Sequence, residues 1–213
     1  MPELPDLELY LHALRPRLVG QSIERVRIAS PFLIRTVEPP IEAAIGRAIL
    51  DLSRLGKRIV WRFEGDLFFV FHLMIAGRFQ WKEKGITIPG RLGLAAFDVP
   101  SATLLLTEAG AKKRASLHVV SGADAVASLD PGGVEVLGLD FASFDTRLRS
   151  ENHTLKRALT DPTLFSGIGN AYSDEILHAA RLSPARRTRD LDAGETARLH
   201  AAVRHTLESW TRR

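Results

Sequence analysis

The chain has 213 residues, 45% apolar and 25% charged, which is ordinary for a folded protein and sufficient for one large core or two modest ones. Lys and Arg outnumber Asp and Glu by 29 to 25, so the net charge of +4 gives a mild bias toward a polyanionic partner. The absence of cysteine excludes disulfides, thiol catalysis and any zinc site that needs Cys ligands. The longest apolar run, 67–75, is too short to span a bilayer, and the first residues do not resemble a signal peptide. We therefore expect a cytoplasmic protein without a membrane span.

The first predicted element is a helix that begins almost at the amino terminus. Pro16 and Gly20 limit how far it can extend. Its apolar positions have the spacing of one helical face: Leu7, Leu11, Leu14 and Leu18.

From Ser22 to about Val120 the sequence consists of short β-branched or aromatic segments separated by turn residues. A short helix near 41–45 interrupts them. Because hairpin spacing dominates and no helices alternate with the strands, the pattern predicts an antiparallel β-sandwich. The predicted strands are 23–28, 59–63, 67–75, 78–81, 92–99, 102–106 and 117–120.

Beyond the turn sequence at 130–133, and clearly after Asp140, apolar residues recur with a helical period. The predicted helices are 144–149, 154–160, 171–181 and 193–210. The expected fold class is thus α+β, with an amino-terminal domain at residues 1–135 that holds the β-sandwich and the first helix. A second, all-helical domain is expected at residues 140–213.

The first candidate for chemistry is Pro2 followed by Glu3. If Met1 is removed, Pro2 carries a terminal secondary amine, and an α-amino group has a pKa near ~8, so part of it is nucleophilic at cellular pH. A secondary amine forms an iminium with an aldehyde-like carbon such as C1′ of deoxyribose, which would displace the base and acidify the 2′ hydrogens. Glu3 is placed to act as a general acid or base. The alternative is a polar chain start before a helix.

The second candidate is the glycine-containing turn at 165–170, which leads directly into a predicted helix. Glycine allows a backbone to approach a ligand closely, and the N–H groups of a helix amino terminus suit a phosphate. Asn170 would either cap the helix or donate to that phosphate, and Lys156 and Arg157 could complete an anion site. The alternative is an ordinary helix-turn-helix.

Several motifs together resemble the formamidopyrimidine-DNA glycosylase and endonuclease VIII family. The opening 1–8 (MPELPDLE) is similar to the family's amino terminus, and the glycine turn resembles its helix-two-turn-helix signature. Gly56-Lys57 and 72–78 (HLMIAGR) resemble a strand lysine and the segment before the lesion-facing hairpin, and 131–135 (PGGVE) resembles the interdomain linker. The motifs occur in the family's order over essentially the whole chain.

This resemblance implies a repair enzyme that binds damaged duplex DNA and flips the damaged nucleotide out of the stack. It implies that Pro2 is the nucleophile, Glu3 the acid and base, and Lys57 a catalytic or phosphate-contacting amine, with His72 and Asn170 near the DNA backbone. Two alternatives stay open: Lys57 as part of a solvated basic edge, and His72 as a core histidine.

Base flipping leaves a hole that such proteins fill with an apolar wedge. The family's wedge position corresponds to Ile75, with Met74 directly before it. Because successive side chains of a strand face opposite ways, only one of the two can point toward DNA, and we favour Ile75. The alternative places both in the sandwich core.

The sequence departs from the family in three places. Members usually continue past the position of Arg213 into a zinc finger, so without cysteine we expect no zinc finger, no metal and no cofactor here, and weaker DNA binding. The segment 107–115 (TEAGAKKRA) replaces the family's opposite-strand reader and lacks its phenylalanine. Its cations Lys112, Lys113 and Arg114 either contact DNA or form a solvated turn. Asp6 replaces a glutamate of the formamidopyrimidine type, which puts specificity for oxidised guanine in doubt.

The predicted function is a DNA repair glycosylase with abasic-site lyase activity, acting through a Pro2 iminium and β,δ-elimination on oxidatively damaged bases. The alternative is a protein of the same fold that only binds or only cleaves abasic sites. The expected partner is double-stranded DNA with damaged bases or abasic sites, bound by a monomer in the bacterial cytoplasm at the nucleoid.

Overall fold

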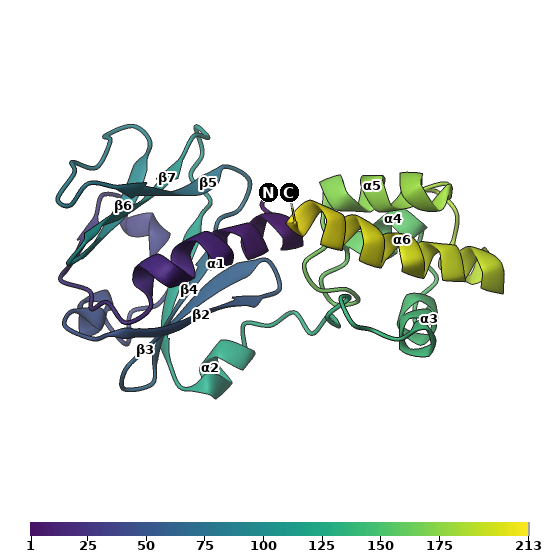
Figure 1. Cartoon of the computed structure of the whole chain (residues 1–213), viewed down its shortest axis with the longest axis horizontal. Helices are drawn as coiled ribbons and strands as arrows, with labels where there is room; N and C mark the ends of the chain where they lie inside the picture. Colours follow the sequence, from purple (N-terminus) through teal and green to yellow (C-terminus); the bar gives the residue numbers. More distant parts are fainter. Residues whose placement is uncertain (213) are drawn as a thin grey trace. The chain divides into compact units, whose positions relative to one another are not determined.

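The computed structural model describes residues 1–212, and the chain divides into two compact units. The first unit contains Met1–Pro2 and Tyr10–Leu129, and the second contains Glu3–Leu9 and the residues from Asp130 onward. Helix α1 (Leu4–Leu18) therefore belongs in part to each unit (Figure 1). Glu3, although third in the sequence, is a residue of the second unit.

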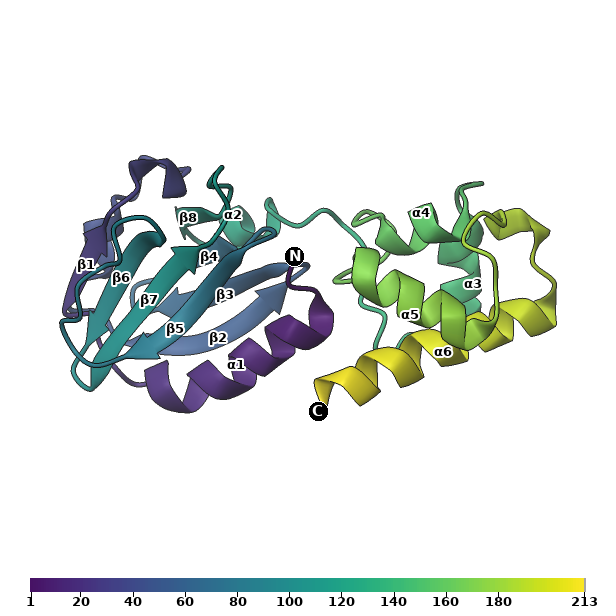
Figure 2. The ribbon, with the colours of Figure 1, turned by 90° about the horizontal axis from the view of Figure 1, so that it is seen from above.

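The first unit contains two four-stranded sheets in separate layers (Figure 2), with strand orders β1-β6-β7-β5 and β2-β3-β4-β8. Every pairing between neighbouring strands is antiparallel, so the predicted sandwich is confirmed. The strands are β1 (Arg25–Ile28), β2 (Ile49–Leu55), β3 (Arg58–Phe63), β4 (Leu67–His72), β5 (Gly77–Lys82), β6 (Gly93–Val99), β7 (Ala102–Glu108) and β8 (Ser116–Ser121).

An aromatic cluster fills the space between the sheets. Trp61 on β3 is fully buried, with its ring centroid 4.8 Å from Phe71 on the same sheet and 5.3 Å from Phe97 on the other sheet. Phe79 on β5 lies 6.1 Å from the same indole. Tilted and edge-to-face aromatic pairs add to the free energy gained from apolar burial, so this cluster fixes how the sheets pack.

Two strand predictions are corrected by the structure. β2 was not predicted, because a register shift between Ile49 and Asp51 interrupts the alternation of apolar and polar residues. The strand predicted at 67–75 ends at His72, because Met74 adopts a left-handed conformation with φ +54°. Short helical segments at η1 (Pro31–Leu33), η2 (Ile41–Ala44) and α2 (Ala123–Ala127) complete the unit.

The second unit is helical from Phe141 onward, as the helical period after Asp140 predicted, with α3 (Phe141–Arg149), α4 (Leu155–Thr160), α5 (Asn170–Ala180), η3 (Thr188–Asp190) and α6 (Ala193–Thr211). Its core includes Phe144 and Phe165, whose stacked rings lie 5.2 Å apart. Asp192 caps α6 in a capping box with Glu195, which explains the sharp start of that helix. None of the helices within residues 1–212 is both long and apolar enough to cross a membrane.

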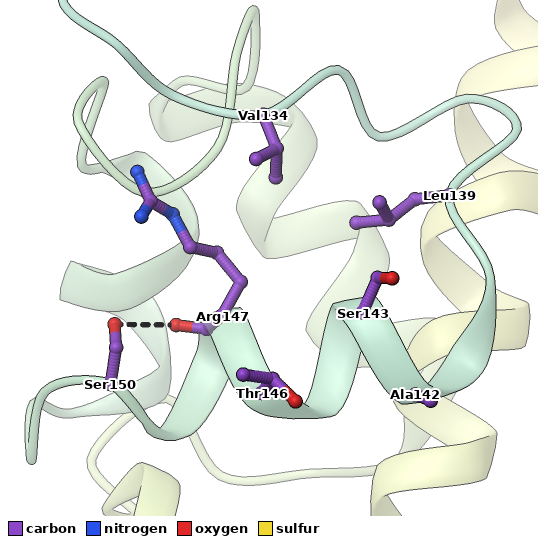
Figure 3. A pocket seen from close by; sticks show the side chains of 7 residues that line it. All are labelled: Val134, Leu139, Ala142, Ser143, Thr146, Arg147 and Ser150. Carbon is purple, nitrogen blue, oxygen red and sulfur yellow. Dashed lines mark hydrogen bonds between the residues drawn. The ribbon is translucent and has the colours of Figure 1, made fainter.

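An open cavity of about 420 Å³ lies beside α3 in the second unit (Figure 3). Its one cation, Arg147, is committed to structure, because the guanidinium donates to the backbone carbonyls of Gly132, Thr163 and Leu164. The cavity is lined by Val134, Leu139, Ala142, Ser143, Thr146, Arg147 and Ser150.

Candidate functional site

The carboxylate of Glu3 is bound at the amino terminus of α5. Its Oε2 accepts hydrogen bonds from the N–H groups of Gly169 at 2.7 Å and Tyr172 at 3.1 Å, and its Oε1 accepts one from Ala171 at 2.9 Å. The residue is only 3% exposed. N–H groups at the positive end of a helix dipole suit an anionic acceptor, and hydrogen bonds to an ionised group are roughly twice as strong as neutral ones. The carboxylate directly after Pro2 is thus fixed in one position.

Gly169 is what allows this approach. A Cβ atom added at Gly169 would lie 2.5 Å from both Cδ and Oε1 of Glu3, which is too close for any real contact. Its φ of −135° is open to any residue, so the requirement for glycine here is steric. Two further hydrogen bonds hold the amino terminus in place: the Leu4 N–H donates to the Gly167 carbonyl at 2.9 Å, and the Glu3 N–H donates to Oδ2 of Asp6 at 2.9 Å.

Tyr172 adds a neutral hydroxyl near the carboxylates of Glu3 and Asp6. Burial raises the pKa of Tyr172 to about 12, with smaller contributions from the negative charges of Asp6 and Glu3. Its ring packs edge-on against Trp210, with centroids 5.8 Å apart. The phenol therefore stays protonated at any physiological pH, and sequence reasoning had not singled it out.

The contacts of Asn170 and Lys156 differ in part from those expected from the sequence. Gly169 occupies the N-cap position of α5 and Asn170 is the first helical residue, so Asn170 does not cap the helix. Its side chain is exposed and has no hydrogen-bond partner within residues 1–212. The Lys156 ammonium donates to the Asn170 carbonyl at 2.7 Å and pairs with Asp174 at 2.6 Å. From the sequence, the N–H groups at the start of α5 were expected to suit a phosphate. In the structure they bind the carboxylate of Glu3 instead.

In the first unit, His72 ends β4 and is half-buried. Its Nδ1 accepts the N–H of Met74 at 3.1 Å, so the proton of the neutral ring lies on Nε2 and remains available to an acceptor. Burial, and to a lesser extent the positive charges of Arg58, Lys57 and His118 in that order, together lower the pKa of His72 to about 4. His72 is thus a neutral N–H donor next to cationic side chains.

We expect this histidine to make folding sensitive to acid. The folded protein favours neutral His72, so the stability it contributes is present above pH 6.5 and is lost as the pH falls toward 4. The loss should be roughly 2 to 3 kcal/mol after allowance for partial exposure. Urea unfolding from pH 7 to pH 4 should show a shallower pH dependence for His72→Gln than for the wild type, whereas exposed His12→Gln should match the wild type. Equal slopes for His72→Gln and the wild type would contradict the expectation.

Met74 and Ile75 lie in a tight turn, so the prediction that they alternate along a strand is wrong. The Gly77 N–H donates to the Leu73 carbonyl at 2.9 Å and closes the turn. Arg78 donates to the carbonyls of Gly77 at 2.7 Å and Ile75 at 3.3 Å. Ile75 is 57% exposed at the tip of the turn, which rules out the alternative that both side chains belong to the core.

The remaining predicted residues lie on surface segments of the first unit. Lys57 is half-buried in the turn between β2 and β3, which Gly56 makes possible with a φ of +58°. Arg114 is exposed, and its backbone N–H donates to the Glu108 carboxylate. Zinc does not fit the side chains present, because the chain has no cysteine and residues 1–212 contain no cluster of His, Asp and Glu suited to a metal ion.

The family model described as the formamidopyrimidine-DNA glycosylase N-terminal domain matches residues 1–119, and the model of the family's H2TH domain matches residues 133–212. A formamidopyrimidine-DNA glycosylase of Heliobacterium modesticaldum is 31% identical over 215 residues, which cover 98% of this chain and 78% of that protein. One of Thermus thermophilus is 34% identical over 211 residues, covering 97% and 74%.

A solved complex of Lactococcus lactis Fpg with DNA that contains an abasic site has the same fold, with a TM-score of 0.90 and 23% identity. The match covers 99% of this chain and 78% of that one. A structure of MutM with DNA that contains carbocyclic 8-oxo-G has a TM-score of 0.90 at 22% identity, covering 99% and 80%. With both of its domains matched in order and relatives above 30% identity along nearly its whole length, the chain belongs to the formamidopyrimidine-DNA glycosylase family.

Proposed function

We propose that this protein excises damaged bases from duplex DNA through the amine of Pro2 and then cleaves the strand at the resulting abasic site. After removal of Met1, the proline nitrogen attacks C1′ of the damaged nucleotide, the glycosidic bond breaks, and the base leaves with the bonding electron pair and takes up a proton. The sugar ring opens to give an iminium. Loss of a 2′ proton expels the 3′ phosphate, a second elimination expels the 5′ phosphate, and water releases the sugar fragment from Pro2.

The observation that supports this proposal most directly is the position of Glu3. Its carboxylate follows the nucleophile in the chain and is held by the N–H groups of Gly169, Ala171 and Tyr172. A positioned carboxylate can pass protons to and from the sugar oxygen and the nucleophile, and such acid and base catalysis contributes typically ~10²- to 10⁴-fold to a rate. We assign Glu3 this proton-transfer role.

The DNA contacts are proposed from the surface of each unit. The Nε2–H of His72 and the ammonium of Lys57 would contact phosphates of the damaged strand, and exposed Ile75 would fill the space left by the flipped base. Asn170, exposed at the start of α5, and Lys156 beside it would contact the backbone from the second unit. Relatives of the same fold have been solved with DNA that contains an abasic site or a damaged base, which supports this partner. The site of action would be the chromosomal DNA of a bacterial cytoplasm.

Borohydride trapping tests the chemistry. Purified protein, with loss of Met1 verified by intact mass, is incubated with duplexes that carry an abasic site, an oxidised pyrimidine or an oxidised purine. We expect a covalent adduct that is lost when Met1 is retained and is reduced in Pro2→Gly. Glu3→Gln should trap poorly on the damaged bases, and Glu175→Gln, an exposed carboxylate on the same helix, should match the wild type.

The lesion that gives most adduct identifies the substrate. An adduct on the abasic duplex alone would indicate a lyase without base excision. No adduct on any duplex, with Met1 absent, would overturn the proposal in favour of a non-catalytic damage binder.

A further inference from the structure

Glu108 is a buried carboxylate that the proposed reaction does not use. It ends β7 and is 2% exposed. Its oxygens accept the N–H of Arg114 at 2.9 and 3.1 Å and the N–H of Ala115 at 3.1 Å. Burial of a carboxylate is costly unless its hydrogen bonds are satisfied, so these bonds hold the segment that supplies the N–H groups in a defined conformation.

That segment is the basic loop, residues 109–114, which contains Lys112, Lys113 and Arg114. The structure separates the three cations. The Lys113 ammonium donates to the backbone carbonyl of Glu108 and the side chain is half-buried, so this charge is used inside the loop. Lys112 and Arg114 are exposed and form no ion pair within residues 1–212. The loop is thus anchored at its base, with two charges directed to solvent.

The basic loop lies beside the turn that carries Ile75. Gly77, which closes that turn, is the register partner of Glu108 across β5 and β7, so the anchor of the loop and the end of the turn are neighbours. Directly opposite residues in an antiparallel pair have Cα atoms about 4.5 to 5.5 Å apart. A duplex whose base stack is entered by Ile75 would therefore have its backbone close to Lys112 and Arg114.

We propose that the basic loop, held by Glu108, is a phosphate-binding clamp for the sugar-phosphate backbone next to the lesion, with Lys112 and Arg114 as its contacts and Glu108 as a positioning residue. Apart from its three cations the loop contains only Ala109, Gly110 and Ala111, so it has no large apolar side chain to insert between bases. Binding through phosphates carries no base information, so the clamp contributes equally whichever base stands opposite the lesion. This inference rests on the proposed function, because the duplex is placed by the Ile75 wedge.

Salt dependence of DNA binding tests the contacts. Each lost phosphate contact should reduce the slope of log affinity against log salt concentration by about 0.9. We expect Lys112→Ala and Arg114→Ala each to show this reduction, and to lower affinity by the same factor for duplexes with C, A, G or T opposite the lesion. Lys82→Ala removes the same charge at the far end of β5 and should leave the slope unchanged. Unchanged slopes in both loop variants, or a loss that depends on the opposite base, would overturn the proposal.

Trypsin cleavage tests the anchor, because the basic loop contains three cleavable residues. We expect slow cleavage in the wild type and at least tenfold faster cleavage in Glu108→Gln, where an amide N–H faces the backbone donors and the charge is lost. A melting curve shows whether Glu108→Gln stays folded. If it does not, Lys112→Ala and Arg114→Ala still test the clamp independently. Equal cleavage rates in a folded Glu108→Gln would refute the anchoring role. Borohydride trapping of the wild type tests the proposed function by itself. A failure of the anchoring role can therefore be distinguished from a failure of the proposed function.

Discussion

Gly169→Ala is expected to lower the rate of base excision by roughly 10²- to 10⁴-fold, the range that acid and base catalysis contributes. The new methyl group would occupy the space of the Glu3 carboxyl, whose Cδ lies 2.5 Å from the added Cβ position. The carboxylate would have to leave the N–H groups of Gly169, Ala171 and Tyr172. Because the backbone at Gly169 is open to alanine, the helix should still form.

Single-turnover excision on the lesion identified by trapping measures this effect. Gly90→Ala is the matched control, since an added Cβ there contacts nothing within 4 Å. If the glycine acts only through Glu3, the double variant Gly169→Ala/Glu3→Gln should be no slower than Glu3→Gln alone, because the two changes remove one interaction. Excision within threefold of the wild type in a folded Gly169→Ala would show that the position of Glu3 does not matter.

Removal of the Ile75 side chain, the proposed apolar wedge, should give the second largest effect. Ile75→Ala is expected to slow base excision by about 10- to 100-fold, because the cost of flipping, a few kcal/mol, is no longer offset by filling the space in the stack. Gly77→Ala should act in the same direction, since its Cβ would lie 2.3 Å from the Leu73 carbonyl oxygen and the turn could not close. Cleavage at a preformed abasic site should fall less, because no base has to be unstacked.

Parallel single-turnover assays on a damaged-base duplex and an abasic duplex measure this difference. Ile86→Ala makes the same side-chain change at another exposed position of the first unit and should behave as the wild type. Ile75 lies on the surface, so its variant is not expected to affect folding. An equal loss on both substrates would argue that the turn contributes only general DNA affinity.

The sequence was sufficient for the fold class because the sandwich and the helices are defined by local patterns. β-branched and aromatic residues such as Ile59, Trp61 and Phe63 predicted β3, and the capping residue Asp192 agrees with the start of α6. Prediction from the sequence failed where the backbone leaves a regular helix or strand. The run of apolar residues after His72 looked like more strand, and nothing local shows that Met74 turns left-handed.

The sequence singled out candidate site residues, but it did not reveal how they are held in space. Pro2 and Glu3 stood out by their chemistry and by resemblance, but the partner of the Glu3 carboxylate lies 166 residues away along the chain. The glycine turn was also singled out, but its N–H groups were assigned to a phosphate because the sequence offers no sign of a carboxylate arriving from the amino terminus. Long-range contacts of this kind depend on the whole fold.

The separation between Glu3 and α5 also bears on when the enzyme becomes competent during its synthesis. Domains generally fold in order as the chain emerges from the ribosome, so the strands of the first unit can pair before α5 exists. Until then the Glu3 carboxylate lacks its N–H partners, although removal of Met1 can already have freed the amine of Pro2. A nascent or prematurely released chain that lacks α5 would therefore lack the positioned carboxylate, and base excision would begin only after the residues of α5 had been translated.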